Sequence, residues 1–241
     1  MTHTITIDST LASIVNEHPD LARELERRSL DYCCGGKRTL SDACEEVGID
    51  PVSTAEELTS ATDRPRADWA DLEPTALVDH LEATHHAYLH DELPRLSLLA
   101  DKVHRVHGAR HPELGDLLAV YAALRADLEP HLVKEERVLF PMIRELDAAG
   151  GGPTPVFHCG SLANPISVML VEHDRAGELL AELRRLSGDY TAPPDACASY
   201  RALYEGLRDL EADTHLHVHK ENNLLFPAVV ELEVDLDPAQ R

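Results

Sequence analysis

Two seventeen-residue stretches decide the fold of this chain: DLEPHLVKEERVLFPMI, from Asp127 to Ile143, and DTHLHVHKENNLLFPAV, from Asp213 to Val229. Aligned without a gap, they share the pattern D-x3-H-x3-E-x3-LFP. Residues four positions apart lie on the same face of an α-helix, so the histidine and the glutamate of each stretch are neighbours on one face. The chain therefore contains a twofold repeat of a helix that presents a His–Glu pair.

The His–Glu pairs lie on the apolar faces of their helices. Apolar residues precede His131 at steps of three and four, and similar steps lead to His217. Such steps are typical of the buried face of a helix in a bundle. A buried carboxylate is costly unless it is paired or bound to a metal. Two of them, Glu135 and Glu221, each beside a core histidine, therefore indicate a metal site.

Four long amphipathic segments contain or flank the repeat. They run from Pro74 to Arg105, Pro112 to Asp147, Asn164 to Leu186, and Asp195 to Val234. The breaks between them, GARHP, AAGGGPTPVFHCGS and SGDYTAPP, are rich in turn-forming residues. The pattern predicts an all-α fold in which residues 74–236 form an up-down four-helix bundle. Residues 1–60 are predicted to form a small domain of short helices, and residues 61–73 a linker.

The first and third helices supply further histidines. His173 lies on the apolar stripe of the third helix. On the first helix, His86 fits best because a stripe of leucines continues its face; His80, His85 and His90 are the other candidates. The distance from His86 to His131 nearly equals that from His173 to His217, so the two halves of the bundle match. The predicted metal ligands are His86, His131, Glu135, His173, His217 and Glu221.

Several polar residues near these ligands are open to interpretation. Asp127 and Asp213 each lie four positions before a ligand histidine. They are either solvated turn residues or acceptors for the distal imidazole N–H of that histidine, and the sequence favours neither. His215 and His219 lie off the inward stripe and are predicted to be solvated, whereas His107 is undecided.

The donor types indicate which metal is bound. Imidazole and carboxylate without thiolate argue against a structural zinc site, and the four-helix setting favours two iron or manganese ions bridged by carboxylates. If both glutamates bridge both ions, about two of six octahedral positions per ion stay free for an oxo or hydroxo bridge and a small ligand. Such a site can bind dioxygen, peroxide or nitric oxide, and it can release iron.

The composition excludes several classes of partner. The chain has 22 Lys and Arg against 44 Asp and Glu, a formal net charge of −22, which disfavours binding to nucleic acid and to anionic membranes. The N-terminus does not resemble a secretory signal, and no uncharged apolar stretch is long enough to span a bilayer. The odd count of five cysteines does not resemble a disulfide framework. A cytoplasmic protein is expected.

Two adjacent cysteines stand in the motif DYCCGG. The neighbouring glycines are expected to expose Cys33 and Cys34, and Lys37 and Arg38 to lower a thiol pKa. A redox or partner-docking role is therefore predicted, the alternative being two small residues in a turn. The other cysteines are Cys44, predicted to serve packing, and Cys159 and Cys197, to which no role is assigned.

These motifs resemble a known family. The bundle resembles hemerythrin-like domains, and almost the whole chain resembles the Repair of Iron Centers family of di-iron proteins. The matching features are DYCCGG at residues 31–36, the paired H-x3-E-x4-FP pattern, PISVM followed by EHD at residues 165–174, and ENN at residues 221–223. The resemblance implies two iron ions held by four histidines and two bridging glutamates at the six positions given above. The Gly150–Ser161 insertion departs from the family pattern.

The resemblance implies a role in stress, and three functions stay open. The first is donation of iron to damaged or apo iron–sulfur proteins after nitrosative or oxidative stress. The second is reduction of nitric oxide or peroxide by the iron pair. The third is a module that binds or senses a small gas such as nitric oxide or dioxygen. The thiol motif favours the first two, and whether the chain forms a homodimer is left open.

Overall fold

The computed structural model describes residues 4–62, 68–150 and 155–236. Within these ranges the chain contains helices and two isolated β-bridges but no β-strand, which confirms the all-α prediction. Parts of the predicted linker and of the Gly150–Ser161 insertion, residues 63–67 and 151–154, lie outside the described residues. No described helix is both long and apolar enough to cross a membrane.

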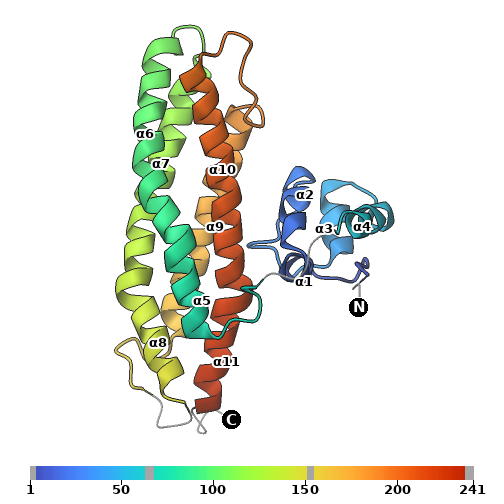
Figure 1. Ribbon diagram of the computed structural model, residues 1–241, viewed down its shortest axis with the longest axis vertical. Coiled ribbons are helices and arrows are strands. Elements are labelled where there is room, and N and C mark those ends of the chain that lie inside the picture. The colour runs from blue at the N-terminus through green and yellow to red at the C-terminus, as the bar shows by residue number, and fades with distance from the viewer. Residues whose placement is uncertain (1–3, 63–67, 151–154, 237–241) are drawn as a thin grey trace.

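Four long rods form the up-down bundle that the sequence predicts (Figure 1). The first rod contains α5 (Pro74–Leu81) and α6 (Ala87–His107), and the second contains α7 (Glu113–Lys134) and α8 (Phe140–Ala148). The third is α9 (Ala163–Leu186), and the fourth contains α10 (Ala198–Lys220) and α11 (Phe226–Leu236). Helix α7 packs against α6 and α9, and α10 closes the bundle against the same two helices.

A π-helical turn interrupts three of the four rods. These turns are Glu82–His86, Glu135–Leu139 and Glu221–Leu225. In the second and fourth rods the turn ends just before Phe-Pro. Proline has no N–H, and its ring crowds the carbonyl four residues upstream, so the helix widens there. The LFP part of the repeat thus accounts for a wider turn that begins at each predicted glutamate ligand.

Two apolar clusters fill the bundle and leave a polar layer between them. One cluster includes Leu93, Leu124 and Leu207, and the other includes Phe140, Met169 and Phe226. The predicted ligands lie where the two clusters meet along each rod, with Leu132 of the first cluster between His131 and Glu135. Apolar packing therefore closes the ligand layer from both ends.

The N-terminal helices lie to one side of the bundle, next to the fourth rod (Figure 1). They are α1 (Leu11–Glu17), α2 (Ala22–Arg27), α3 (Leu40–Val47) and α4 (Pro51–Ser60). Side chains of Thr39 and Asp50 cap α3 and α4, and Gly48 ends α3 with a φ of 75°, a value that favours glycine. Their apolar core includes Val218 of α10, so the small unit and the bundle share packing.

The DYCCGG loop fits tightly on the fourth rod. A Cβ added at Gly36 would lie 2.6 Å from the carbonyl oxygen of Tyr32 and 2.6 Å from Oδ1 of Asn223. His219 also binds the N-terminal unit: its Nδ1 lies 3.1 Å from the carbonyl oxygen of Tyr32 in this loop, and its Nε2 lies 2.8 Å from Oδ1 of Asn16 in α1. The prediction that His219 is solvated was wrong: its side chain is fully buried, because the N-terminal unit covers this face of α10.

Replacing Gly36 by alanine should destabilise the protein by about 1–3 kcal/mol, because a backbone oxygen stands where the methyl group must go. Gly177→Ala is the matched control, since nothing lies within 4 Å of its added Cβ and the residue is inside a helix. The control should be neutral or stabilising by up to about 1 kcal/mol. Urea unfolding measures both changes, and equal stabilities of the two variants would contradict the close fit of the loop.

Candidate metal centre

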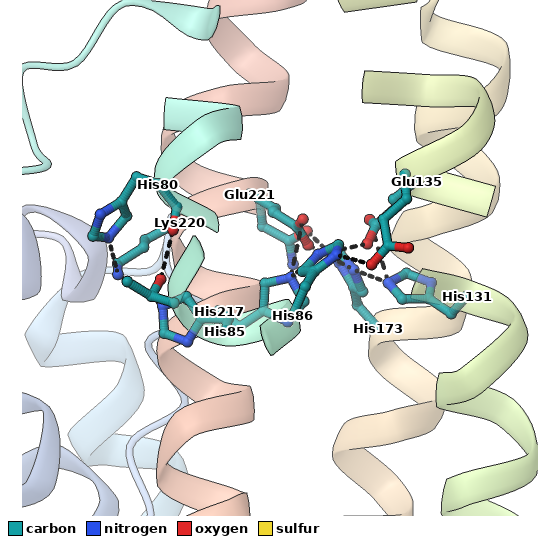
Figure 2. Close-up of polar contacts among 12 residues, drawn as sticks. His80, His85, His86, His131, Glu135, His173, His217, Lys220 and Glu221 are labelled. Carbon is teal, nitrogen blue, oxygen red and sulfur yellow. Dashed lines mark hydrogen bonds and ion pairs between the residues drawn. The ribbon is translucent and has the colours of Figure 1, made fainter. Parts of the chain in front are cut away.

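The structure brings all six predicted ligands together at the centre of the bundle (Figure 2). They form two overlapping groups, and within each group the ligand atoms lie within 4.8 Å of one another. One group contains His86 and His217, the other contains His131 and His173, and both contain Glu135 and Glu221. All six side chains are buried.

The distances have an approximate twofold symmetry. The Nε2 atoms of His86 and His217 are 3.2 Å apart, and so are those of His131 and His173. Glu221 reaches one histidine of each pair, at 3.1 Å from Nε2 of His217 and 3.1 Å from Nε2 of His173. Glu135 does the same for the other two histidines, at 3.3 Å from His131 and 3.5 Å from His86. Each carboxylate therefore spans both groups.

The outer nitrogens of three imidazoles meet hydrogen-bond acceptors. Nδ1 of His86 lies 2.9 Å from Oε1 of Glu136, and Nδ1 of His131 lies 2.9 Å from Oε2 of Glu172. An ionised carboxylate only accepts, so each Nδ1 carries a proton and each Nε2 points inward, where it can bind a metal in its deprotonated form. The same holds for His173, whose Nδ1 lies 2.7 Å from Oδ1 of Asn222.

The donor set fits a pair of cations. Inward Nε2 lone pairs at 3.2 Å repel one another unless a positive charge lies between them. Neither oxygen of Glu135 nor Oε2 of Glu221 accepts a hydrogen bond from the described residues, although all three atoms are buried. Buried acceptors without donors are costly, and a metal ion removes that cost. Four imidazoles and two carboxylates without thiolate suit iron or manganese.

Without a metal, protons balance part of the buried negative charge. Burial lowers the pKa of His131, but the Glu135 carboxylate outweighs it and raises that pKa to about 9. Burial raises the pKa of Glu221, but the neighbouring His217 and His173 hold it well below its usual range. A metal bound by His131 must therefore displace a proton from it.

The structure decides between the two interpretations that the sequence left open for Asp127 and Asp213: neither accepts a hydrogen bond from the predicted ligand four positions after it. Asp127 is exposed and lies 3.8 Å from the guanidinium of Arg175, with no bond to His131. Asp213 bonds to Nδ1 of His85 at 2.8 Å, not to His217. The actual acceptors, Glu136, Glu172 and Asn222, each stand next to a ligand in the sequence and on a neighbouring helix. That adjacency is the signal through which sequence reasoning could have found them.

Removing one of these acceptors should weaken the site. Glu172→Ala leaves Nδ1 of His131 without its acceptor, and loss of such a partner typically lowers metal affinity about 10–100-fold. Asp127→Ala is the matched control and should leave the affinity within about twofold, because Asp127 touches no ligand. Competition with a colorimetric iron chelator measures both. Equal affinities in the two variants would contradict the assignment of Glu172.

The surroundings of His217, the fourth histidine, differ from those of the other three. Nδ1 of His217 has no hydrogen-bond partner among the described residues, and the ring of His85 stacks on it at 5.3 Å. His85 belongs to a buried polar row that Figure 2 shows beside the six ligands. In that row Nζ of Lys220 lies 2.7 Å from Nε2 of His85 and 2.8 Å from Nε2 of His80. Burial lowers the pKa of Lys220 to about 8.

The other predicted histidines lie outside the ligand groups. His90 bonds to Glu136 at the rim of the site, at 2.7 Å. His215, which is predicted to be solvated, is partly exposed and lies 3.5 Å from Glu26. His107, which the sequence left undecided, is buried far along the bundle and contacts the sulfur of Cys197 at 3.2 Å.

The vicinal cysteines differ in environment. Cys33 is buried, and its thiol donates to Oδ1 of Asp31 at 3.1 Å. Its pKa lies well above the usual value, because the hydrogen bond to Cys34 and burial both disfavour the thiolate. The predictions that glycines expose this sulfur and that nearby basic residues lower its pKa were wrong: Arg38 pairs with Glu46 instead. Cys34 is partly exposed, and Cys44 is buried in the small unit's core, as predicted.

Comparison with known protein families agrees with this centre. Residues 77–229 match the hemerythrin HHE cation binding domain, and residues 7–62 match ScdA_N, a domain of unknown function (DUF542). The chain therefore belongs to the hemerythrin HHE cation-binding domain family.

Relatives that align over almost their whole length carry names that state a function. The iron-sulfur cluster repair protein YtfE of Escherichia coli O157:H7 is 35% identical over 221 residues, which cover 91% of this chain and 96% of that protein. The proteins of the same name from Cronobacter sakazakii and Citrobacter koseri are 37% and 36% identical over 222 residues. These alignments cover 91% of this chain and 95% and 96% of the two relatives.

Proposed function

We propose that this protein holds two iron ions in its cluster of four histidines and two glutamates and donates iron to damaged iron–sulfur proteins. The observation that carries the proposal is the symmetrical cluster, in which Glu135 and Glu221 each span two histidine pairs. The printed name of the relatives, iron-sulfur cluster repair protein, supports the same role for this chain.

The donor count favours a site that can release its metal. The cluster offers each ion two imidazole nitrogens and two carboxylate oxygens. About two of six octahedral positions per ion then stay free of protein donors. A ligand group from the protein that receives the iron can therefore bind without first displacing a side chain. Bound iron would serve here as the cargo, and its open positions would also accept nitric oxide or peroxide.

The remainder of the chain supports a thiol-assisted role. Residues 1–60 contribute the DYCCGG loop, in which Cys34 faces a groove between α2, α9 and α10. We assign Cys33 and Cys34 to docking of, or redox exchange with, the damaged protein. Five free cysteines favour a reducing compartment such as the cytoplasm.

A transfer assay tests the proposal. The iron-loaded protein is mixed with a [2Fe–2S] protein stripped of its cluster, a sulfide source and a thiol reductant, with and without an iron chelator. Cluster absorbance should return in both conditions, whereas an equal amount of free iron should fail when the chelator is present. Absence of recovery above the free-iron control would overturn iron donation.

Two controls make the assay specific. The Glu135→Ala/Glu221→Ala variant lacks both shared carboxylates and should transfer no iron. Nitrous oxide is measured in parallel after addition of nitric oxide, because steady catalytic production without cluster recovery would instead favour nitric oxide reduction at the same centre.

A further inference from the structure

The four ligand histidines are not held alike on their outer sides. Glu136 and Asn222 occupy equivalent places in the repeat, since each follows a shared glutamate, and each accepts the Nδ1 proton of a ligand histidine. Glu136 is an acid on the bundle's own surface, whereas Asn222 is a neutral amide beneath the DYCCGG loop. An amide is a weaker acceptor than a carboxylate. The orientation of His173 therefore depends more on the position of Asn222 than the orientation of His86 depends on the position of Glu136.

Asn222 faces two parts of the protein at once. Its Oδ1 accepts from His173 at 2.7 Å, and its Nδ2 points to the loop, 3.4 Å from the Cys33 carbonyl and 4.0 Å from the Cys34 sulfur. The amide group is planar, so Oδ1 and Nδ2 turn together. A shift of Nδ2 away from the loop therefore moves Oδ1 away from His173.

The loop itself is firmly held, so a change at one sulfur is not absorbed by loop movement. The Asp31 carboxylate accepts from the backbone N–H groups of Cys33, Cys34 and Gly35 at 2.9–3.0 Å. Nδ2 of Asn223 donates to the Cys33 carbonyl at 2.9 Å, next to the close approach at Gly36. The Cys34 sulfur has two long contacts, one of 3.9 Å to the Cys33 sulfur and one of 4.0 Å to Nδ2 of Asn222. The Cys33 thiol is also bonded to Asp31, so Asn222 is the partner that can turn.

Cys34 is also reachable from solvent. Both vicinal cysteines line a groove of about 690 Å³, together with Asp174 and Gly177 of α9 and His215 of α10. Cys34 is partly exposed, while Cys33 and Cys44 are buried. A reagent that enters this groove meets the Cys34 sulfur with Asn222 close to it and His173 beyond.

We propose that Asn222 is a positioning residue that couples Cys34 to His173, so that covalent modification of the Cys34 thiol loosens the metal position formed by His131 and His173 before the other one. The coupling is steric. A group added to the Cys34 sulfur occupies the space beside Nδ2 of Asn222, so the amide must turn. His173 then loses Oδ1, the acceptor that orients its ring. The inference rests on the proposed two-iron centre.

Alkylation of the iron-loaded full chain tests the coupling. In a Cys159→Ser/Cys197→Ser background, Cys34 is the remaining thiol that is not buried. N-ethylmaleimide forms a bond between the sulfur and a ring carbon, and the thiol proton ends on the neighbouring carbon. Mass spectrometry confirms the site, and iron release to a chelator is followed with time. One of the two ions should leave about 10–100-fold faster, the loss typical of an outer partner, and a one-iron species should accumulate.

Variants of Asn222 distinguish this coupling from a nonspecific effect of alkylation that speeds the release of both ions. Without alkylation, Asn222→Ala should speed the release of the same one of the two ions. Alkylation of this variant should not increase the release rate further, because the two changes act through one contact. Asn222→Asp keeps an acceptor for His173 and should restore slow release. Cys34→Ser should not respond to the reagent. Equal acceleration of both ions, or full acceleration by alkylation in the alanine variant, would overturn the inference.

The starting measurement separates this inference from the proposed function. If the unmodified protein holds fewer than about two irons per chain, the two-iron centre itself is wrong. If it holds two irons and repairs clusters but alkylation releases both equally or neither, only the coupling through Asn222 is wrong. If alkylation releases one ion first but the transfer assay fails, the coupling stands without iron donation.

Discussion

Replacing Glu135 and Glu221 together by alanine is expected to reduce the iron content from about two ions per chain to nearly none. Each ion position would keep two imidazoles and lose both of its carboxylate ligands, along with the negative charge that offsets a divalent or trivalent cation. Each single variant should lose iron sharply, because each carboxylate serves both positions. Metal analysis of protein purified from iron-rich medium measures the result.

Glu211→Gln is the matched control for the loss of a buried carboxylate. Glu211 lies on α10, as buried as the ligands, but it pairs with Arg184 and belongs to no ligand group. This variant should keep its iron even where it loses some stability. Full iron occupancy in the double glutamate variant, with a normal helical circular dichroism spectrum, would end the assignment of the centre.

Removing the metal should lower the melting temperature by about 5–10 °C. A ligand at about 100 times its Kd stabilises the folded state by about 2.7 kcal/mol. For a domain of this size, each kcal/mol shifts the melting temperature by about 2–4 °C. The physical cause is that the metal-free centre keeps two buried carboxylates among four inward imidazoles, and only protons, such as the one held by His131, replace the cations. Differential scanning calorimetry with and without a chelator measures the shift.

The double glutamate variant provides the reference for this effect. It lacks the shared carboxylates, so addition of iron or chelator should leave its melting temperature unchanged. An iron-dependent shift that persists in this variant would show that iron stabilises the protein elsewhere.

The bundle, and the meeting of six His and Glu side chains at its centre, could be predicted from the sequence because both depend on local periodicity. The four-residue spacing from His131 to Glu135 and from His217 to Glu221 places each pair on one helix face without knowledge of any neighbour. The repeat supplied the second copy, and the apolar steps showed which face is buried. The helices of the bundle end within a few residues of the Gly- and Pro-rich breaks for the same reason.

The surroundings of the ligands depended on the tertiary structure. A histidine that turns Nε2 inward points Nδ1 at a neighbouring helix, not at the residue four positions earlier on its own helix. The acceptors are therefore Glu136, Glu172 and Asn222 from adjacent rods, in place of Asp127 and Asp213. Which residues face each other across two helices depends on helix rotation and register, and neither is encoded in a single periodic pattern.

The second buried face of α10 is the clearest example of burial that the periodicity of the helix does not predict. By periodicity this helix has one apolar stripe, and His219 and Lys220 fall outside it. His219 is nevertheless buried, because the N-terminal unit packs on that side and brings Asn16 and Tyr32 against it. Lys220 is buried against His80, His85 and Trp69. The sequence determined which six side chains meet at the centre of the bundle. Only packing between helices decided which residues orient three of the four histidines among them, because those contacts join positions 41–50 residues apart on different rods.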